Sequence, residues 1–292
     1  FDVLRLWGPM PKEKNNKSVL SYVTEYGREY TPRISSGEFI GKLLEDINRA
    51  EEILSEIDPI QWNPLNYSYD VIAGNGYVDR TFWRRRQTRM NYFAVCGLKS
   101  RVALWSDDHA TALKYARKII DHVQTYSNER LYSLGSVTTF ESGMDRTLSS
   151  EHIFALEVYN LDSKSIERFR NDGKGNLQGD QDVLRAFYEA GDMRLEKWWG
   201  FELNTSSINP LSVYTLRKFL QPEGMSSQAK NKIPLMRLSE MYLIAIECGD
   251  ENSQELYDTF YKSRGLSTRE LDRTGLKTMI SDEYNKEFYG EG

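Results

Sequence analysis

The sequence is poor in the residues that most often build metal sites and disulfide frameworks. It has two cysteines, Cys96 and Cys248, and three histidines, His109, His122 and His152, among 292 residues. No two histidines stand at a metal-ligand spacing and no cysteine accompanies them, so we expect no bound metal. Each cysteine lies among apolar residues of a helical pattern, which predicts two buried free thiols.

Sequence signatures of catalysis are missing as well. The chain has no G-x-S-x-G elbow, no H-E-x-x-H pair, no P-loop and no G-x-G-x-x-G motif after a strand. Asp180 and Asp182 stand beside glycines, but the alternating oxygen ligands and the closing glutamate of a calcium loop are absent. We therefore expect neither an enzyme nor a cofactor.

Charge and hydropathy argue against nucleic acid and against a membrane-spanning helix. The net charge is −5, whereas a nucleic-acid-binding face needs concentrated positive charge, so Arg84–Arg86 and Arg89 are expected to be a solvated face. No stretch is apolar over the ~20 residues that a membrane helix needs. The chain starts at Phe1 and stops at Gly292 within patterned segments, and we expect a fragment of a longer protein.

Helical periodicity dominates what is present. Apolar residues recur three and four positions apart in segments at about 37–56, 88–105, 108–126, 233–248, 253–263 and 275–288. Alternation predicts strands only at Glu151–Asn160 and Ser212–Leu220, and Asp180–Ala190 could form a short helix. The pattern predicts a mainly α fold with less than about a fifth of its residues in strands.

We expect a single domain, 1–292, with three consecutive regions after an irregular start. Residues 1–36 contain prolines that break any helix. Residues 37–126 form the helix-pair region, 127–233 are loop-rich and expected to face a ligand, and 234–292 form the C-terminal helices.

Six blocks of the sequence, taken in order, resemble the SusD/RagB-like family of outer-membrane nutrient-binding lipoproteins. The blocks are Phe1–Pro11, Arg89–Ile120, Glu151–Glu157, Gly191–Arg194, Lys232–Glu247 and Glu283–Gly292. In the fifth block, Arg237 is followed three residues later by Glu240 and then by an aliphatic helix. The resemblance implies a SusD-like α-superhelix of tetratricopeptide-like helix pairs, with long loops and a few short strands.

The same resemblance implies a function and a location. It implies surface capture of a nutrient, a glycan rather than a peptide, and its delivery to a SusC-like TonB-dependent transporter. The protein would lie at the cell surface of the outer membrane, held by an N-terminal lipid anchor outside this fragment.

Aromatic residues in irregular segments are the candidate ligand platforms, since the chain has 18 Tyr, 12 Phe and 6 Trp. A sugar ring can lie on a Trp or Tyr ring while amides and hydroxyls bind its hydroxyl groups. Successive rings of an extended segment point to opposite sides, so we expect Trp198 or Trp199 to be exposed near a cleft. The predicted contacts are Trp198, Trp199, Tyr214, Trp62, Tyr67 and Trp83, with Tyr69 in the same loop.

Charged pairs in the resembling blocks are expected to be structural. Arg237 and Glu240, three residues apart on a helix, can pair with each other or cap neighbouring backbone groups, and the same interpretation applies to Asp192 and Arg194.

Two other functions stay open. A glycoside hydrolase on a helical scaffold needs two placed carboxylates, which leave no local motif. A tetratricopeptide-type adaptor would bind a protein partner in a concave groove with charged clamps.

Overall fold

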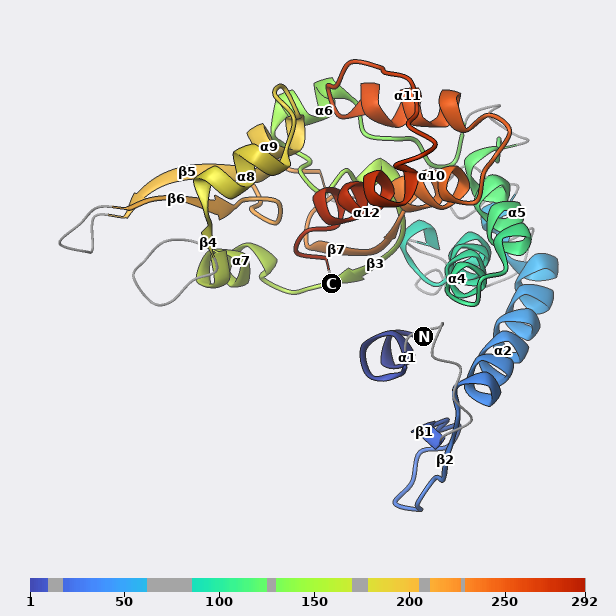
Figure 1. Ribbon diagram of the computed structural model, residues 1–292. Coiled ribbons are helices and arrows are strands. Elements are labelled where there is room, and N and C mark those ends of the chain that lie inside the picture. Colours follow the sequence, from blue (N-terminus) through green and yellow to red (C-terminus); the bar gives the residue numbers. More distant parts are fainter. Residues whose placement is uncertain are drawn as a thin grey trace, which may run out of the picture.

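The computed structural model describes residues 1–9, 18–61, 86–124, 130–169, 178–204, 211–226 and 229–291. Within these residues helices dominate and the strands are few and short (Figure 1). The prediction of a mainly α fold is confirmed. No helix of the described ranges is long and apolar enough to cross a membrane.

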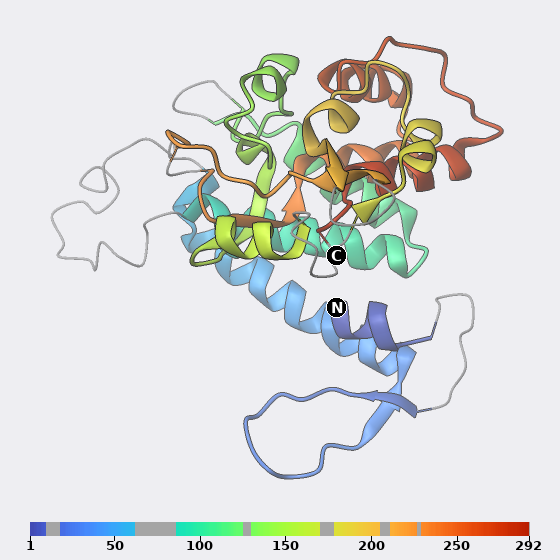
Figure 2. The same cartoon turned by 90° about the vertical axis from the view of Figure 1, so that its left-hand side faces the viewer.

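The N-terminal residues are more regular than their prolines suggest. Helix α1 covers Asp2–Trp7, and strands β1 (Ser18–Ser21) and β2 (Arg33–Ser35) pair antiparallel. The expectation of an irregular start was wrong for these segments, since Pro9 follows just past the end of α1, but residues 22–32 are irregular as expected. The long helix α2 (Ser36–Ile57) begins at a capping box of Ser35 and Glu38 and runs from this hairpin to the main body (Figures 1 and 2).

The main body is a set of packed helices around α10 (Leu238–Glu247). Helix α10 contacts α5 (His109–Ile120), α11 (Ser253–Ser263) and α12 (Leu276–Glu287), while α4 (Tyr92–Trp105) packs on α2 and α5. Every residue of α10 from Leu238 to Ile246 is buried, including the polar Ser239 and Glu240, so the helix lies at the centre of the body. The predicted helices in these regions are confirmed with shorter bounds at both ends of the α4–α5 pair.

One predicted helix begins as a strand. Residues Lys232–Arg237 form β7, which pairs antiparallel with β3 (His152–Glu157), and α10 starts only at Leu238. Pro234 therefore lies in a strand and not in a first helical turn. The run of apolar residues through 233–248 cannot separate a buried strand from a buried helix, which explains the error.

A second, smaller layer lies beside the helical body. Its sheet has the order β4-β6-β5, with β4 at Gln178–Gly179, β6 at Leu211–Leu216 and β5 at Trp199–Asn204. Short helices surround it: α6 (Val137–Ser142), α7 (Leu161–Phe169), α8 (Gln181–Phe187) and α9 (Met193–Trp198). In Figure 1 the β5–β6 hairpin projects away from the helical body.

Within the described ranges, three 3-10 turns complete the elements: η1 (Pro59–Gln61), η3 (Arg86–Thr88) and η4 (Ser149–Glu151). Asp180 caps α8, where its side chain accepts hydrogen bonds from the backbone of Asp182 and Val183. Cys96 is buried and Cys248 is half-buried, and both are free thiols. The prediction of free thiols is confirmed, and full burial holds only for Cys96.

Candidate functional site

The predicted aromatic platforms divide into two groups. Trp62, Tyr67, Tyr69 and Trp83 lie outside the described residues. Trp198 and Trp199 are described, and they are 0% and 4% exposed. The expectation that one of them is substantially exposed was therefore wrong.

The two tryptophans point into different surroundings because α9 ends at the first and β5 begins at the second. The indole nitrogen of Trp198 donates to the carbonyl of Arg146 at 2.6 Å, and the ammonium of Lys218 lies 3.9 Å from its ring centroid. The indole nitrogen of Trp199 donates to the hydroxyl of Tyr188 at 3.4 Å. Each ring is covered by segments far away in the sequence.

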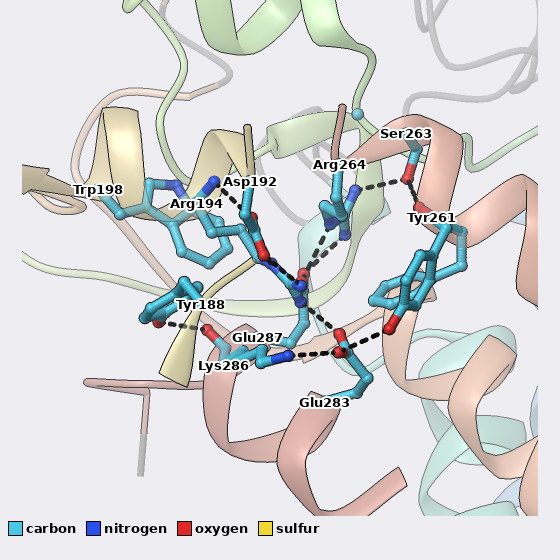
Figure 3. A network of polar contacts seen from close by, with 12 residues as sticks. Tyr188, Asp192, Arg194, Trp198, Tyr261, Ser263, Arg264, Glu283, Lys286 and Glu287 are labelled. Carbon is cyan, nitrogen blue, oxygen red and sulfur yellow. Dashed lines mark hydrogen bonds and ion pairs between the residues drawn. The ribbon is translucent and has the colours of Figure 1, made fainter. Parts of the chain in front are cut away.

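The surroundings of Trp198 are part of a buried ionic core (Figure 3). We use this name for ten residues that pair with one another and are at most 7% exposed in their side chains: Glu151, Asp192, Arg194, Lys218, Arg237, Arg264, Glu283, Lys286, Glu287 and Glu291. Five are cations and five are carboxylates, so the charges balance.

Glu287 of α12 is the centre of this core. Its carboxylate lies 2.6 Å from both Arg237 and Arg264 and 3.2 Å from Arg194. Burial alone would raise its pKa, but Arg264 and Arg237 outweigh burial and hold the pKa well below 4.5. Helix α12 is thereby fixed to β7, α9 and the end of α11 at once.

The charged residues in the other blocks that resemble the family are also paired, but not always with the partners expected from the sequence. Asp192 and Arg194 pair with each other at 2.8 Å, and Arg194 also reaches Glu283. Arg237 and Glu240 do not pair. Arg237 bonds the ionic core, whereas both oxygens of Glu240 accept from Arg101 at 2.6 Å. Their structural role is supported, and the pairing of these two residues with each other was wrong because α10 starts after Arg237.

The surroundings of Trp199 are aromatic. In the antiparallel register Trp199 lies opposite Leu216 and Phe201 lies opposite Tyr214, so these four side chains share one face of the sheet. The rings of Phe201 and Tyr214 meet edge to face at 5.9 Å, and those of Trp199 and Tyr289 at 4.8 Å. We call Tyr289, Trp199, Tyr214 and Phe201 the aromatic track.

Two rings of the aromatic track are open to solvent. Tyr289 is 46% and Phe201 is 48% exposed, while Tyr214 is half-buried. Neither Tyr289 nor Phe201 was among the predicted site residues. The alternation of β5 could have indicated Phe201, since it stands two residues from Trp199 and hence on the same face. Tyr289 follows a helix, and no local pattern marks its exposure.

The inner end of the track opens into a cleft of about 1820 Å³. The cleft is lined by residues of α1, α4, α10, α12 and the outer sheet, and by Phe1 and Glu291 near the two chain ends. Its volume exceeds the ~300–1,000 Å³ of a typical small-molecule pocket, so it has room for an extended ligand. Its aromatic lining residues are Phe1, Trp105, Phe169, Trp199, Tyr284, Phe288 and Tyr289.

The described residues of the cleft lining have no surplus of positive charge, since four arginine or lysine side chains face five carboxylates and His109 is neutral at pH 7. The cationic or titratable basic side chains are Arg5, Arg101, His109, Arg273 and Lys277. The carboxylates are Asp2, Asp107, Glu240, Glu247 and Glu291. Several are paired across short distances: Arg101 with Glu240, His109 with Asp107 at 3.2 Å, and Arg5 with Asp2 at 3.6 Å.

The pKa of Glu247, a carboxylate of this lining, is raised above its ordinary value. Burial is the main cause, and the positive charges of His109 and Lys277 only partly oppose it. In the described ranges no three His, Cys, Asp or Glu side chains gather as a set that could hold a metal ion. The cleft thus offers rings and hydrogen-bonding groups without a surplus of cations.

No protein-family model matches the chain, and no curated protein sequence matches it. Several solved structures are similar to the chain. The chain is similar to a SusD superfamily protein from Bacteroides thetaiotaomicron VPI-5482, with a TM-score of 0.68 and 23% identity over 100% of this chain and 62% of that chain. It is similar to a SusD-like carbohydrate binding protein from Bacteroides vulgatus ATCC 8482, with a TM-score of 0.66 and 18% identity over 95% and 55%.

A third similar structure is surface glycan-binding protein A from Bacteroides fluxus, with a TM-score of 0.58 and 16% identity over 91% of this chain and 60% of that one. The chain therefore spans 55–62% of the length of these three proteins. At these identities the comparison establishes the fold. The SusD-like fold that the six sequence blocks indicate is confirmed.

Proposed function

We propose that this chain binds a glycan at a cell surface and does not catalyse its breakdown. The observation that carries the proposal is the likeness of nearly the whole chain to SusD-like structures, of which one is named for carbohydrate binding and another for surface glycan binding. Fold alone does not fix function, so the proposal also depends on the chemistry of the site.

The chemistry of the site supports a sugar ligand. The aromatic track offers ring faces and edges on which the apolar face of a pyranose can lie, and the cleft beside it adds amide groups such as those of Gln178 and Asn285. Such binding needs neither a catalytic pKa nor a metal ion. Trp199 and Tyr214, predicted from the sequence, remain proposed contacts within this track, whereas Trp198 belongs to the buried ionic core.

The complete protein would also have a membrane anchor and a transporter partner. A surface glycan-binding protein with this fold would be anchored by lipid in the outer membrane and would pass its ligand to a SusC-like TonB-dependent transporter. The partner and the anchor are proposed on the resemblance of the sequence blocks and on the shared fold.

A hydrolase is the weaker candidate. Glu240 and Glu247 are two turns apart on α10 and both line the cleft, and the raised pKa of Glu247 would suit a general acid. However, Arg101 occupies both oxygens of Glu240. A carboxylate held in this way is a poor nucleophile or base, so the pair favours structure over hydrolysis.

A glycan array tests the proposal directly. The purified chain, labelled at an added terminal tag, should bind a subset of printed glycans, and incubation with those glycans should release no reducing sugar. Reproducible release of sugar that is lost in Glu247→Gln would make the protein an enzyme. An array without any bound glycan would remove the proposed function.

A further inference from the structure

We infer that Arg146 and Arg217 form a positively charged subsite that takes the carboxylate or sulfate group of an acidic glycan. The inference rests on the proposed function and adds to it a binding residue and a class of ligand. It draws on the placement of the two arginines around Trp198 and on the lack of a carboxylate partner for Arg146. Neither arginine is among the residues that line the cleft.

The backbones of the two arginines are bound to the same buried residue. The carbonyl of Arg146 accepts from the indole nitrogen of Trp198 at 2.6 Å, and the backbone N–H of Arg217 donates to the carbonyl of Trp198 at 2.6 Å. The guanidinium of Arg146 donates to the carbonyl of Leu220 at 3.4 Å, and the N–H of Leu220 donates to the carbonyl of Arg217. The guanidinium of Arg146 therefore lies against the turn 217–220 that carries Arg217.

Both arginines have a rigid support. Two residues after Arg146, Leu148 is fully buried and has a φ of +57°, a left-handed conformation that a bulky residue keeps only where the surrounding structure enforces it. The guanidinium of Arg217 lies across Gly200, where a Cβ would collide with it. A ligand that binds here meets groups that are already ordered, which lowers the entropic cost of binding.

Arg146 lacks the acidic partner that the arginines of the ionic core have. It is half-buried, and within the described ranges no carboxylate lies at ion-pair distance from its guanidinium. Two acidic side chains in its surroundings are engaged elsewhere. Asp145 accepts from the backbone and the hydroxyl of Ser149, and Asp162 accepts from the backbone N–H of Gln221 at 2.8 Å. A charge removed from water without a partner costs free energy, so this arrangement favours an external anion.

The positive charge of Arg217 adds to this cost. Burial lowers the pKa of Arg146, Arg217 lowers it further, and Asp162 only partly opposes them. Arg217 has interactions of its own, so it acts here as a second positive charge while Arg146 is the group that binds. The fork of guanidinium donors suits the paired oxygens of a carboxylate or sulfate. An acidic glycan would relieve the repulsion, whereas an uncharged one would leave it in place.

The test uses polymers of both classes and variants of the whole chain. Affinity gel electrophoresis with polygalacturonate, alginate and chondroitin sulfate represents acidic glycans, and starch, mannan and laminarin represent uncharged ones. Titration calorimetry with an oligosaccharide of the best-retained acidic polymer then compares the wild type with Arg146→Gln and Arg146→Lys. Arg49→Gln is the matched control, because it removes the same charge from the exposed face of α2.

We expect an acidic polymer to be retained and Arg146→Gln to bind its oligosaccharide about 10- to 100-fold more weakly, the scale of losing a charge-assisted hydrogen bond. Arg146→Lys keeps the charge without the fork and should bind with intermediate affinity. Arg49→Gln should bind like the wild type. Without a ligand, Arg146→Gln should melt no earlier than the wild type, because it removes a repelled charge and keeps the backbone bond to Trp198.

NMR of the wild type distinguishes a glycan from a free anion. The Nε–H resonance of Arg146, assigned by its loss in Arg146→Gln, should shift with the binding curve of the oligosaccharide. Sodium sulfate at the same concentrations should leave it in place. A shift with sodium sulfate alone would assign the pair to a free anion and overturn the inference.

Three further results would contradict the subsite. Retention of an acidic polymer that Arg146→Gln binds as well as the wild type would remove it and leave the proposed function intact, and so would retention of uncharged polymers alone. Early melting of Arg146→Gln, with an Nε–H resonance of Arg146 that the oligosaccharide leaves unmoved, would make this arginine structural. No retention of any polymer by the wild type would remove the proposed function and the subsite together.

Discussion

Trp198 and Trp199 are neighbours in the sequence and belong to two regions with opposite chemistry. Trp198 faces the ionic core, where its ring is covered by Lys218 and Arg237. Trp199 faces the aromatic track, where its ring is covered by another ring, that of Tyr289. In the first region every charge has a partner within the protein, and in the second the outer rings are left for solvent or a ligand.

The comparison separates residues that build the fold from residues that can bind. Buried ion pairs add little net stability compared with apolar packing, but removing one partner leaves an uncompensated buried charge. The ionic core should therefore be intolerant of substitution. Phe201, the half-exposed ring at the outer end of the track, should tolerate substitution better.

Glu287→Ala is expected to have the largest effect. It leaves Arg237 and Arg264 buried without their closest carboxylate, which should lower the free energy of unfolding by about 3–5 kcal/mol. Urea denaturation followed by circular dichroism measures this loss. Glu56→Ala, on the exposed face of α2, is the matched control and should change stability by less than about 0.5 kcal/mol. Equal stability of the two variants would break the comparison.

The variants Trp198→Ala and Phe201→Ala compare how much one ring at the ionic core and one ring of the aromatic track contribute to stability. Removing the fully buried ring of Trp198 should cost about 3–5 kcal/mol of unfolding free energy. Removing the half-exposed ring of Phe201 should cost about 1 kcal/mol or less, since much of its surface is already in water. Thermal melts of both proteins check the order, and a larger loss in Phe201→Ala would assign that ring to the core.

Acid should weaken the ionic core before it affects the track. The positive groups around Glu283 and Glu287 hold the pKa values of these carboxylates below the ordinary 4.5 despite burial. Protonation of the two carboxylates should therefore lower the free energy of unfolding. Their contribution is complete above about pH 4.5 and is lost as the pH falls further. Urea denaturation at pH 7, 5, 4 and 3 should show stability falling below pH 4.5.

The Glu287→Gln variant isolates this contribution. It should be less stable than the wild type at pH 7 and should lose less stability between pH 5 and 3. Glu56→Gln should follow the wild-type slope. If Glu287→Gln and the wild type lost stability in parallel, the carboxylate of Glu287 would not be the group that acid titrates.

The sequence predicted elements well where one amphipathic pattern decides them. Helices α2 and α11 have bounds within a residue or so of those predicted, because their polar and apolar faces repeat without interruption. The strand at Lys232–Arg237 was missed because β3, about 80 residues earlier in the chain, supplies its hydrogen-bonding partner. The hydrophobic periodicity of a segment holds no information about a partner strand so far away in the sequence.

The site was less predictable than the fold. The burial of Trp198 depends on Lys218 and Arg237, and that of Trp199 on Tyr188 and Tyr289, all contributed by other segments. Composition marked the segment from 198 to 214 as rich in rings and amides, and Tyr214 does lie on the track. Which rings remain exposed depends on the assembled structure.

The most direct test of the account is aromatic-ring NMR of the whole chain during titration with an oligosaccharide of the glycan that it binds best on the array. The ring resonances of Tyr289, Phe201 and Tyr214 should shift with one common binding curve. Those of Trp198 and of Phe260 in α11, which are both 0% exposed, should stay in place. Shifts confined to rings away from the track, with Tyr289 and Phe201 unchanged, would contradict the account.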